Sequence, residues 1–274
     1  LDCDDTPEAD ELERRGRVME EAAMAVPGIK QMSHCGASWS TSRSWLAASN
    51  GFFAHKTSGY SSMAAVAISE RDGAMERDFE SSSERTLAKH KSPEWIGAEA
   101  GRRAATRLGA RKLDSQTAAV IFDRKLSSRL LGAFVGAISG PAIARGVSFL
   151  KDKMGKPVFA SGVDVIDDPL RLGGFGSRGF DGEGRPVKRS ALVKDGVLQQ
   201  WLLNGPAARQ LGLQPNGFAS MGFGDPPGVT TSNLDIQPGR RSLAELMADA
   251  GSGLLVTDMF GPSLNPNTGD YSVG

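Results

Sequence analysis

Residues 117–160 read TAAVIFDRKLSSRLLGAFVGAISGPAIARGVSFLKDKMGKPVFA, and the fold is expected to be organised around them. The apolar run Ala118–Phe122 is short and contains β-branched residues, which predicts a buried strand. Asp123 is a suitable helix N-cap, and Gly140-Pro141 predicts the helix end because proline lacks an N–H and disfavours a helical residue before it. Between these signals, apolar residues recur at helical spacing at Leu126, Leu130, Leu131, Phe134, Val135 and Ile138.

Downstream of this stretch, the sequence contains many turn signals between short alternating runs. Lys194-Asp195-Gly196 separates two such runs, Ser190–Val193 and Val197–Leu203, which strongly predicts a β-hairpin. Other expected elements are strands at Pro157–Phe159, Val163–Ile166, Thr230–Ile236 and Leu254–Asp258, and helices at Arg145–Lys153 and Ser242–Ala250. The second half is therefore predicted to be mostly antiparallel β structure with a few helices.

Upstream, helical patterns flank a region of alternating residues. Residues 10–25 predict an amphipathic helix, and Ser92-Pro93-Glu94 opens a second helix that reaches about Leu108. The polar segment 71–91 predicts a loop or short helix, and the polar residues 110–116 predict a domain boundary. Antiparallel strands are expected at about residues 29–39, 43–49, 52–57 and 61–70, with breaks at Asn50-Gly51 and Gly59-Tyr60.

The composition excludes several classes of protein. Lysine plus arginine and aspartate plus glutamate each total 32 in 274 residues, and this zero net charge gives no support to a nucleic-acid partner. The longest apolar run, Leu130–Ile138, is far shorter than the ~20 residues that span a bilayer. Two cysteines are too few for a disulfide framework, and without a visible signal peptide we expect a cytoplasmic location. Because Leu1 is not a methionine and a turn-rich segment precedes Gly274, we expect missing sequence at both ends.

Candidate catalytic and metal-binding patterns are weak. The three histidines, His34, His55 and His90, have no helical pairing, and neither H-E-x-x-H nor H-E-x-x-x-H occurs. Cys35 beside His34 does not form a Cys–His dyad because adjacent strand residues point to opposite faces. The pair Asp167-Asp168 before a proline favours a turn. The acidic loop at 180–184 lacks the spacing of a calcium loop, and the glycines at 173–176 lack the residues of a phosphate loop.

Two segments allow a functional interpretation beside a structural one. A basic cluster with nearby phenylalanines fits a nucleic-acid groove, but a solvated loop or a loop at a subunit interface fits better. Its members are Arg171, Arg178, Arg185, Lys188 and Arg189. The run Thr230–Asn233 fits either a strand that pairs with an extended peptide or an internal strand, and the internal strand is favoured.

Several segments, in order along the chain, carry a family resemblance. They are SNGF (49–52), GAMERDFESSS (73–83), GAISGPAIARGVSFLKDKMG (136–155), VIDDPLRLGGFGSRGFDGEGRPVKRSALVKDGVLQQWLLN (165–204), ARQLGL (208–213), TTSNLDIQPG (230–239) and GPSLNPNTGDYSVG (261–274). With these segments the chain resembles the TldD/PmbA family, on its PmbA (TldE, "modulator of DNA gyrase") side. The resemblance covers nearly the whole chain.

The resemblance implies a two-domain α+β subunit. Residues 1–114 would form part of an N-terminal domain of helices with an antiparallel sheet, and residues 115–274 a β-rich, barrel- or sandwich-like C-terminal domain that is truncated at its end. Active TldD-type subunits carry H-E-x-x-x-H on the helix that here reads LLGAFVGAISG. Leu131, Gly132 and Gly136 occupy those positions and supply no ligand side chain. We therefore expect no cofactor and no catalysis in this chain alone, with zinc in a TldD-type partner.

The resemblance also implies partners and a function. The expected function is that of the non-metal subunit of a cytoplasmic metallopeptidase that cleaves unfolded or leader peptides, paired with a TldD-type zinc subunit or with itself. The candidate peptide or partner contacts are Arg145, Thr231, Ser232 and Asn233, and no catalytic or metal-binding residue is assigned. An alternative is a self-associating peptide-binding or scaffold protein without proteolytic activity. A third possibility, DNA binding, predicts a salt-dependent affinity and is disfavoured by the zero net charge.

Overall fold

The computed structural model describes residues 6–222, 224, 226–261 and 263–273, which form two compact units. Unit 1 comprises residues 1–46 and 54–114, and unit 2 comprises residues 47–53 and 115–274. Both units mix helices with mainly antiparallel sheets, as expected, but the strands within the described ranges do not close into a barrel. The predicted barrel- or sandwich-like form of the second half is therefore not confirmed. None of the described helices combines the length and apolar character needed to cross a membrane.

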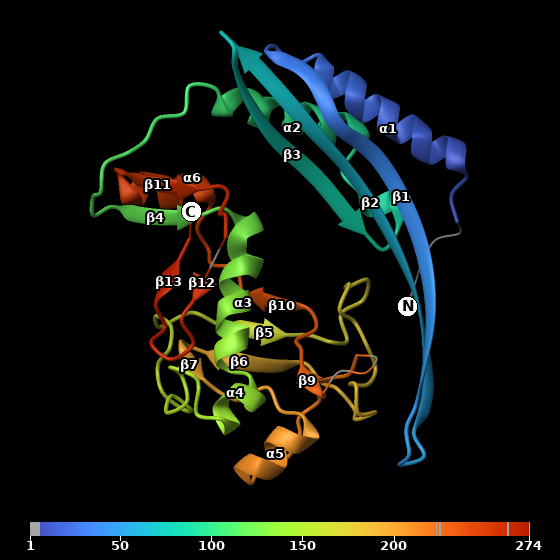
Figure 1. Cartoon of the computed structure of the whole chain (residues 1–274), viewed down its shortest axis with the longest axis vertical. Coiled ribbons are helices and arrows are strands. Elements are labelled where there is room, and N and C mark those ends of the chain that lie inside the picture. Colours follow the sequence, from blue (N-terminus) through green and yellow to red (C-terminus); the bar gives the residue numbers. More distant parts are fainter. Residues whose placement is uncertain (1–5, 223, 225, 262, 274) are drawn as a thin grey trace. The chain divides into compact units, whose positions relative to one another are not determined.

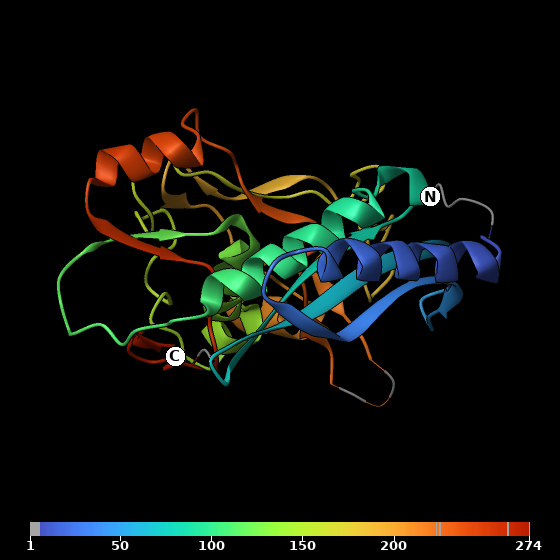
Figure 2. The same ribbon diagram turned by 90° about the horizontal axis from the view of Figure 1, so that it is seen from above.

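Unit 1 is a three-stranded antiparallel sheet with two helices on one face (Figures 1 and 2). Met63, Ala65 and Ala67 alternate along one strand and are fully buried against Met19 and Ile96 of the helices. This two-residue period is the reason that one sheet face forms the core. The elements are α1 Ala9–Met24, β1 Ile29–Ala47, β2 Phe53–Arg71, β3 Ala74–Glu84, the 3₁₀ turn η1 Leu87–Lys89 and α2 Pro93–Arg107.

The strands of unit 1 are longer than the sequence predicted. Gly59-Tyr60 does not break β2, and β3 replaces the loop or short helix expected within residues 71–91. The polar run of β3 forms a strand because its charges find partners on α2. Asp78 is buried and accepts hydrogen bonds from Arg103 Nε and Arg107 Nη1, each at 3.3 Å. These partners are far away in sequence, so the local pattern did not reveal the strand.

Unit 2 contains the remaining elements in a less regular arrangement. Its main sheet has the strand order β10-β5-β6-β7, and the smaller sheets pair β4 with β11, β8 with β9 and β12 with β13. The helices are η2 Arg124–Leu126, α3 Ser127–Ala137, α4 Gly140–Ala144, α5 Gly205–Leu211 and α6 Leu243–Ala250. The strands are β4 Ala119–Phe122, β5 Val165–Asp167, β6 Ser190–Lys194, β7 Val197–Leu198, β8 Ala219–Ser220, β9 Gly228–Val229, β10 Leu234–Ile236, β11 Gly253–Val256, β12 Ser263–Leu264 and β13 Tyr271–Ser272.

The core of unit 2 lies between α3 and the main sheet. Leu131 and Phe134 of α3 join a buried cluster with Val165, Leu192 and Leu198 of the strands. The stretch 117–160 therefore does supply the central helix of this unit. Burial of each such side chain contributes about 1.5–3 kcal/mol, so α3 is held mainly by packing.

Parts of the central stretch differ from expectation. The strand β4 is exposed rather than buried, with Val120 at 49% and Phe122 at 40% exposure, because β11 is its only neighbouring strand among the residues that the structure describes. Asp123 caps the 3₁₀ turn η2 that leads into α3, since its carboxylate accepts a hydrogen bond from Lys125 N at 2.8 Å, whereas Leu126 is the N-cap residue of α3 itself. Gly140-Pro141 opens α4 after α3 has ended at Ala137.

Other local predictions had mixed outcomes. Residues 145–153 form turns rather than a helix, and the run at 157–159 contributes only the single bridge Pro157↔Val197. The hairpin at Asp195-Gly196 is confirmed, and both residues have the positive φ angles, 47° and 77°, that its tight turn requires. The helix predicted from Ser242 is confirmed as α6, and Ser242 and Glu245 form a reciprocal capping box.

Gly97 and Gly16 provide a matched test of packing in unit 1. A Cβ at Gly97 would lie 2.0 Å from Met19 O, so Gly97→Ala must separate α1 from α2 and is expected to cost about 3 kcal/mol. A Cβ added at Gly16 would have its nearest neighbour, Gly36 Cα, at 3.7 Å, which is an ordinary contact. Gly16→Ala is therefore expected to stabilise α1 by about 0.5–1 kcal/mol. Hydrogen exchange of α1 and α2 amides measures both effects. Equal protection in the two variants would contradict this account of the packing.

Candidate functional site

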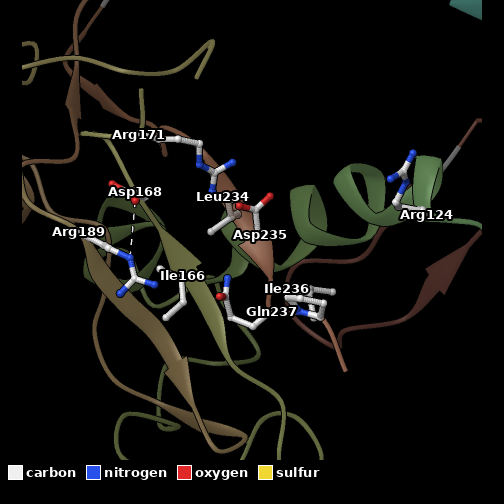
Figure 3. A pocket seen from close by; sticks show the side chains of 10 residues that line it. Arg124, Ile166, Asp168, Arg171, Arg189, Leu234, Asp235, Ile236 and Gln237 are labelled. Atoms are coloured by element: carbon white, nitrogen blue, oxygen red, sulfur yellow. Dashed lines mark hydrogen bonds and ion pairs between the residues drawn. The ribbon is translucent and has the colours of Figure 1, made fainter. Parts of the chain in front are cut away.

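Unit 2 contains a cleft of about 470 Å³ beside the β10 end of the main sheet (Figure 3). Charged side chains and the last residues of β10 surround an apolar floor that includes Ile166. The lining residues are Arg124, Ile166, Asp168, Arg171, Arg189, Leu234, Asp235, Ile236, Gln237 and Pro238. A cleft that combines apolar floor and polar walls with strand backbone can hold a peptide-like ligand.

The strand β10 is the last strand of its sheet, so one of its edges faces the cleft. Asp168 N donates to Asn233 O at 3.0 Å, and Gln237 N donates to Asp164 O at 2.9 Å. Because antiparallel bonding alternates along a strand, the backbone groups of Leu234 and Ile236 point away from β5. In the part of the chain that the structure describes, these groups have no backbone partner on that side.

Charged side chains around the cleft pair with one another. Arg171 pairs with Asp235, and Arg189 Nε lies 3.6 Å from Asp168 Oδ2. Figure 3 shows both arginines reaching over the sheet from the same side. Arg189 is an exposed side chain that makes no hydrogen bond to any described residue, so its guanidinium donors are available to a ligand.

Two of the predicted contact residues serve the framework of the cleft. Asp167 Oδ1 accepts from Ser232 N at 2.7 Å and Asp167 Oδ2 accepts from Ser232 Oγ at 2.8 Å. Asn233 Oδ1 accepts from Gly176 N at 3.0 Å, while Asn233 Nδ2 donates to Asp168 O at 2.6 Å and to Ser177 Oγ at 2.9 Å. Ser232 and Asn233 therefore position the start of β10.

The other two predicted contacts are placed differently. Thr231 is half-buried next to Ser232, and its carbonyl accepts from Thr230 Oγ1 at 3.2 Å. Arg145 is exposed at the C-terminal end of α4 and is not one of the residues that line the cleft. The structure thus brings Thr231, Ser232 and Asn233 together on the chain that leads into β10, and neither they nor Arg145 are among the residues that line the cleft.

The glycine-rich segment 173–176 has a packing role. A Cβ at Gly176 would lie 2.4 Å from Ser232 O, and a Cβ at Gly174 would lie 2.5 Å from Asn233 Oδ1. Only glycine permits this approach of the loop to the chain leading into β10. The resemblance to a phosphate loop therefore has a purely structural explanation.

Buried carboxylates near the cleft hold backbone N–H groups. Asp167 lies in β5 rather than in the expected turn, and burial raises the pKa of its carboxyl group against the opposing effect of the Ser232 hydrogen bonds. Asp181 Oδ1 accepts from the N–H groups of Glu183 and Arg185, both at 2.9 Å. Glu183 in turn accepts from Gly205 N at 2.9 Å, at the start of α5. The acidic loop at 180–184 thus connects chain segments.

The basic cluster is also engaged in contacts of this kind. Arg178 Nη2 donates to Thr230 O at 3.1 Å, and Arg185 Nε pairs with Glu183 at 3.1 Å. Arg171 and Arg189 pair with aspartates at the cleft, while Lys188 lines a second cleft of about 560 Å³. These contacts indicate that the basic cluster belongs to a structured loop, and they argue against its interpretation as a nucleic-acid groove.

The helix α3 does not fit a zinc site. Leu131 is buried in the core. A Cβ added at Gly132 or at Gly136 would point into open space, with no described atom within 4 Å. His90 is far from α3 in sequence and contacts Ser61 Oγ and Ser82 Oγ within unit 1, each at 2.9 Å. Among residues 6–222, 224, 226–261 and 263–273, no three His, Cys, Asp or Glu side chains are placed to hold a metal ion.

Sequence reasoning missed part of the cleft. Arg124, Asp235, Ile236 and Gln237 were not singled out, although Pro238-Gly239 correctly marked the end of the strand. The available signal was the alternation of Leu234, Asp235 and Ile236 before the proline, which is typical of an edge strand.

Comparison with known proteins identifies the family. Residues 115–274 match the PmbA/TldA metallopeptidase C-terminal domain, and residues 3–108 match the PmbA/TldA metallopeptidase central domain. The chain belongs to the PmbA/TldD family. Metalloprotease PmbA of Escherichia coli O157:H7 is 37% identical over 213 residues, which cover 78% of this chain and 45% of that protein. A metalloprotease of Methanothermobacter thermautotrophicus is 33% identical over 65% of this chain and 39% of its own length.

Solved structures of PmbA/TldD-like proteins share the fold. A Thermotoga maritima protein described as a modulator of a DNA gyrase has a TM-score of 0.88 at 24% identity, covering 97% of this chain and 61% of that one. TldE from Thermococcus kodakarensis has a TM-score of 0.83 at 18% identity, covering 98% of this chain and 61% of that one. The present chain spans less than half of the length of the curated relatives described above.

Asp167 provides a test of the cleft framework. Asp167→Ala removes the acceptor of both Ser232 bonds and is expected to destabilise unit 2 by about 2 kcal/mol. Asp167→Asn keeps an acceptor for Ser232 N and should cost less. Urea unfolding followed by hydrogen exchange of unit 2 measures the difference.

The pH dependence of the stability of unit 2 provides a second test of the role of Asp167. Because the pKa of folded Asp167 is raised above its ordinary value of 3.8, the folded state holds a proton longer than the unfolded state. This contribution to stability is present below that value and is lost as pH rises through the folded pKa. Asp167→Asn should abolish this loss, and an unchanged pH profile would contradict the assignment.

Proposed function

We propose that this chain is the non-metal-binding subunit of a TldD/TldE-type metallopeptidase complex that cleaves unfolded or leader peptides. The observation that carries the proposal is the helix α3, where Leu131, Gly132 and Gly136 stand in place of the ligand motif of active subunits. The names of the curated relatives, metalloprotease PmbA among them, and the TldE fold neighbour support this assignment. The zinc would belong to a TldD-type partner, in the cytoplasm.

Within that complex, we propose that β10 holds part of the peptide. The outward backbone groups of Leu234 and Ile236 can pair with an extended chain, and Arg189 presents its guanidinium donors above the same cleft. Thr231, Ser232 and Asn233 would fix the start of that strand. Arg145 would belong to a partner contact, since it is exposed on α4 away from the cleft lining.

Metal content and activity test the subunit assignment. The untagged chain is expected to carry less than about a tenth of an equivalent of zinc by plasma mass spectrometry, because α3 offers no ligands. Mixing with a TldD-type zinc subunit should give a complex that cleaves an unfolded peptide, with activity abolished by a chelator. The matched control is a partner whose H-E-x-x-x-H histidines are replaced by alanine.

Two outcomes would reject the assignment. Near one equivalent of zinc and chelator-sensitive cleavage by the isolated chain would place the chemistry on this chain. Failure to form an active complex, together with peptide binding by the chain alone, would favour the self-associating scaffold.

The role of β10 is tested by removing one outward donor. Ile236→Pro deletes an N–H that points away from β5 and is expected to raise the KM of the complex for an unfolded peptide by about tenfold. Ile236→Val keeps that N–H and should behave like the parent chain. Circular dichroism of both variants controls for folding. Equal KM values for two well-folded variants would remove β10 from the peptide site.

A further inference from the structure

Three asparagines of this chain stand directly before a glycine: Asn50, Asn204 and Asn216. The backbone nitrogen of such a glycine can attack the side-chain carbonyl carbon of the asparagine, because glycine has no Cβ to obstruct the approach. The attack produces a cyclic imide and releases the side-chain amide as ammonia. The surroundings of each pair decide whether this reaction can occur in the folded chain.

The Asn204-Gly205 pair is held on both sides of the reacting bond. Asn204 is 1% exposed, and its Nδ2 donates to Pro227 O at 2.8 Å and to Gly228 O at 3.2 Å. The nucleophile, Gly205 N, donates to the Glu183 carboxylate at 2.9 Å. Both the leaving group and the attacking nitrogen are therefore fixed by hydrogen bonds.

Asn216 is half-buried, and both ends of its side-chain amide are bonded. Its Nδ2 donates to Gln200 Oε1 at 3.1 Å and to Trp201 O at 2.9 Å, while its Oδ1 accepts from Leu203 N at 2.9 Å. Rotation of this amide into a reactive position would break these bonds, which disfavours deamidation of Asn216 in the folded chain.

Asn50 lies in a different environment, at the exposed tip of the loop that joins β1 to β2. Its Oδ1 accepts from Phe52 N at 3.0 Å, which places a donor where negative charge develops during the attack. Its Nδ2, the leaving group, donates to no residue that the structure describes. Gly51 N donates to Ala48 O at 3.0 Å, and a bond at a loop tip opens more readily than bonds in the core.

We propose that Asn50 is a site of spontaneous deamidation and that its products loosen the attachment of this loop tip within unit 2. A bond forms between Gly51 N and Asn50 Cγ, the Cγ–Nδ2 bond breaks, and the proton from Gly51 N leaves with the ammonia. Water then opens the imide. Cleavage of the bond to Cγ gives aspartate, and cleavage of the bond to the backbone carbonyl carbon gives isoaspartate, whose main chain runs through the side chain. Each product carries a new negative charge.

The contacts of Phe52 explain the expected effect on the loop tip. Residues 47–53 belong to unit 2, where the Phe52 ring centroid lies 5.0 Å from that of Phe180. A Cβ at Gly184 would lie 2.6 Å from Phe52 Cγ, so the ring packs directly on the backbone of the acidic loop at 180–184. Isoaspartate lengthens the main chain beside Phe52, and its charge lies on a segment that contacts an acidic loop. Both changes weaken the packing of Phe52.

Peptide mapping of the aged chain tests the site. The folded chain is incubated at mildly alkaline pH, and each Asn-Gly pair is followed by mass spectrometry, with isoaspartate detected by an isoaspartate-specific O-methyltransferase. Asn50 is expected to react at least about tenfold faster than Asn204 and Asn216, whose leaving amides must first lose their hydrogen bonds. In urea, where that protection is absent, the three pairs should react at similar rates. Equal rates in the folded chain, or an Asn50 that stays intact, would overturn the proposal.

Hydrogen exchange tests the effect on the loop tip. The aged parent chain should exchange faster than the fresh chain at residues 47–53 and 180–184. Asn50→Gln, whose longer side chain disfavours this ring closure, should not change on ageing, and Phe52→Ala should reproduce the faster exchange without ageing. Circular dichroism confirms that each variant is folded. Unchanged exchange in the deamidated chain would overturn the loosening of the tip, and neither measurement depends on peptidase activity or on a partner subunit.

Discussion

The buried carboxylate of Asp167 holds together the part of unit 2 in which the cleft lies. It accepts two hydrogen bonds from Ser232 and thereby fixes the chain that leads into β10. The next residue, Asn233, is held by the glycine-rich loop through Gly176 and Ser177. Burial of a charge without these partners would cost several kcal/mol, so the network is required for the site to form.

This network explains which aspects of the site the sequence could predict. The segment Thr230–Asn233 was predicted as the start of a strand, but the strand begins only at Leu234, and the side chains of Ser232 and Asn233 bond to partners that lie about 60 residues away. A polar side chain in a strand looks the same in sequence whether it binds a ligand or a loop. The sequence likewise does not show whether Gly174 and Gly176 bind a ligand or allow close packing. The structure shows packing, because the backbone at these glycines lies against Asn233 and Ser232.

The same distinction applies to the fold: elements that depend on neighbouring residues were predicted, and elements that depend on residues far away in sequence were missed. The Asp195-Gly196 hairpin and the α6 capping box were predicted because a few neighbouring residues determine them. The strand β3 was missed because Asp78 depends on arginines of α2. The exposure of β4 was missed because an apolar run reveals its preference for burial but not the number of neighbouring strands that the chain supplies.

The pairing of β4 with β11 has a consequence for how unit 2 is made. The strand at Ala119–Phe122 finds its only described neighbour at Gly253–Val256, at the other end of the unit's sequence. Contacts of such large sequence separation form late, because the intervening loop must first be closed. During synthesis the N-terminal strand therefore emerges from the ribosome well before its neighbour exists. Its apolar residues Val120 and Phe122 lack a partner strand in that interval, and an unpaired apolar strand favours aggregation and chaperone capture.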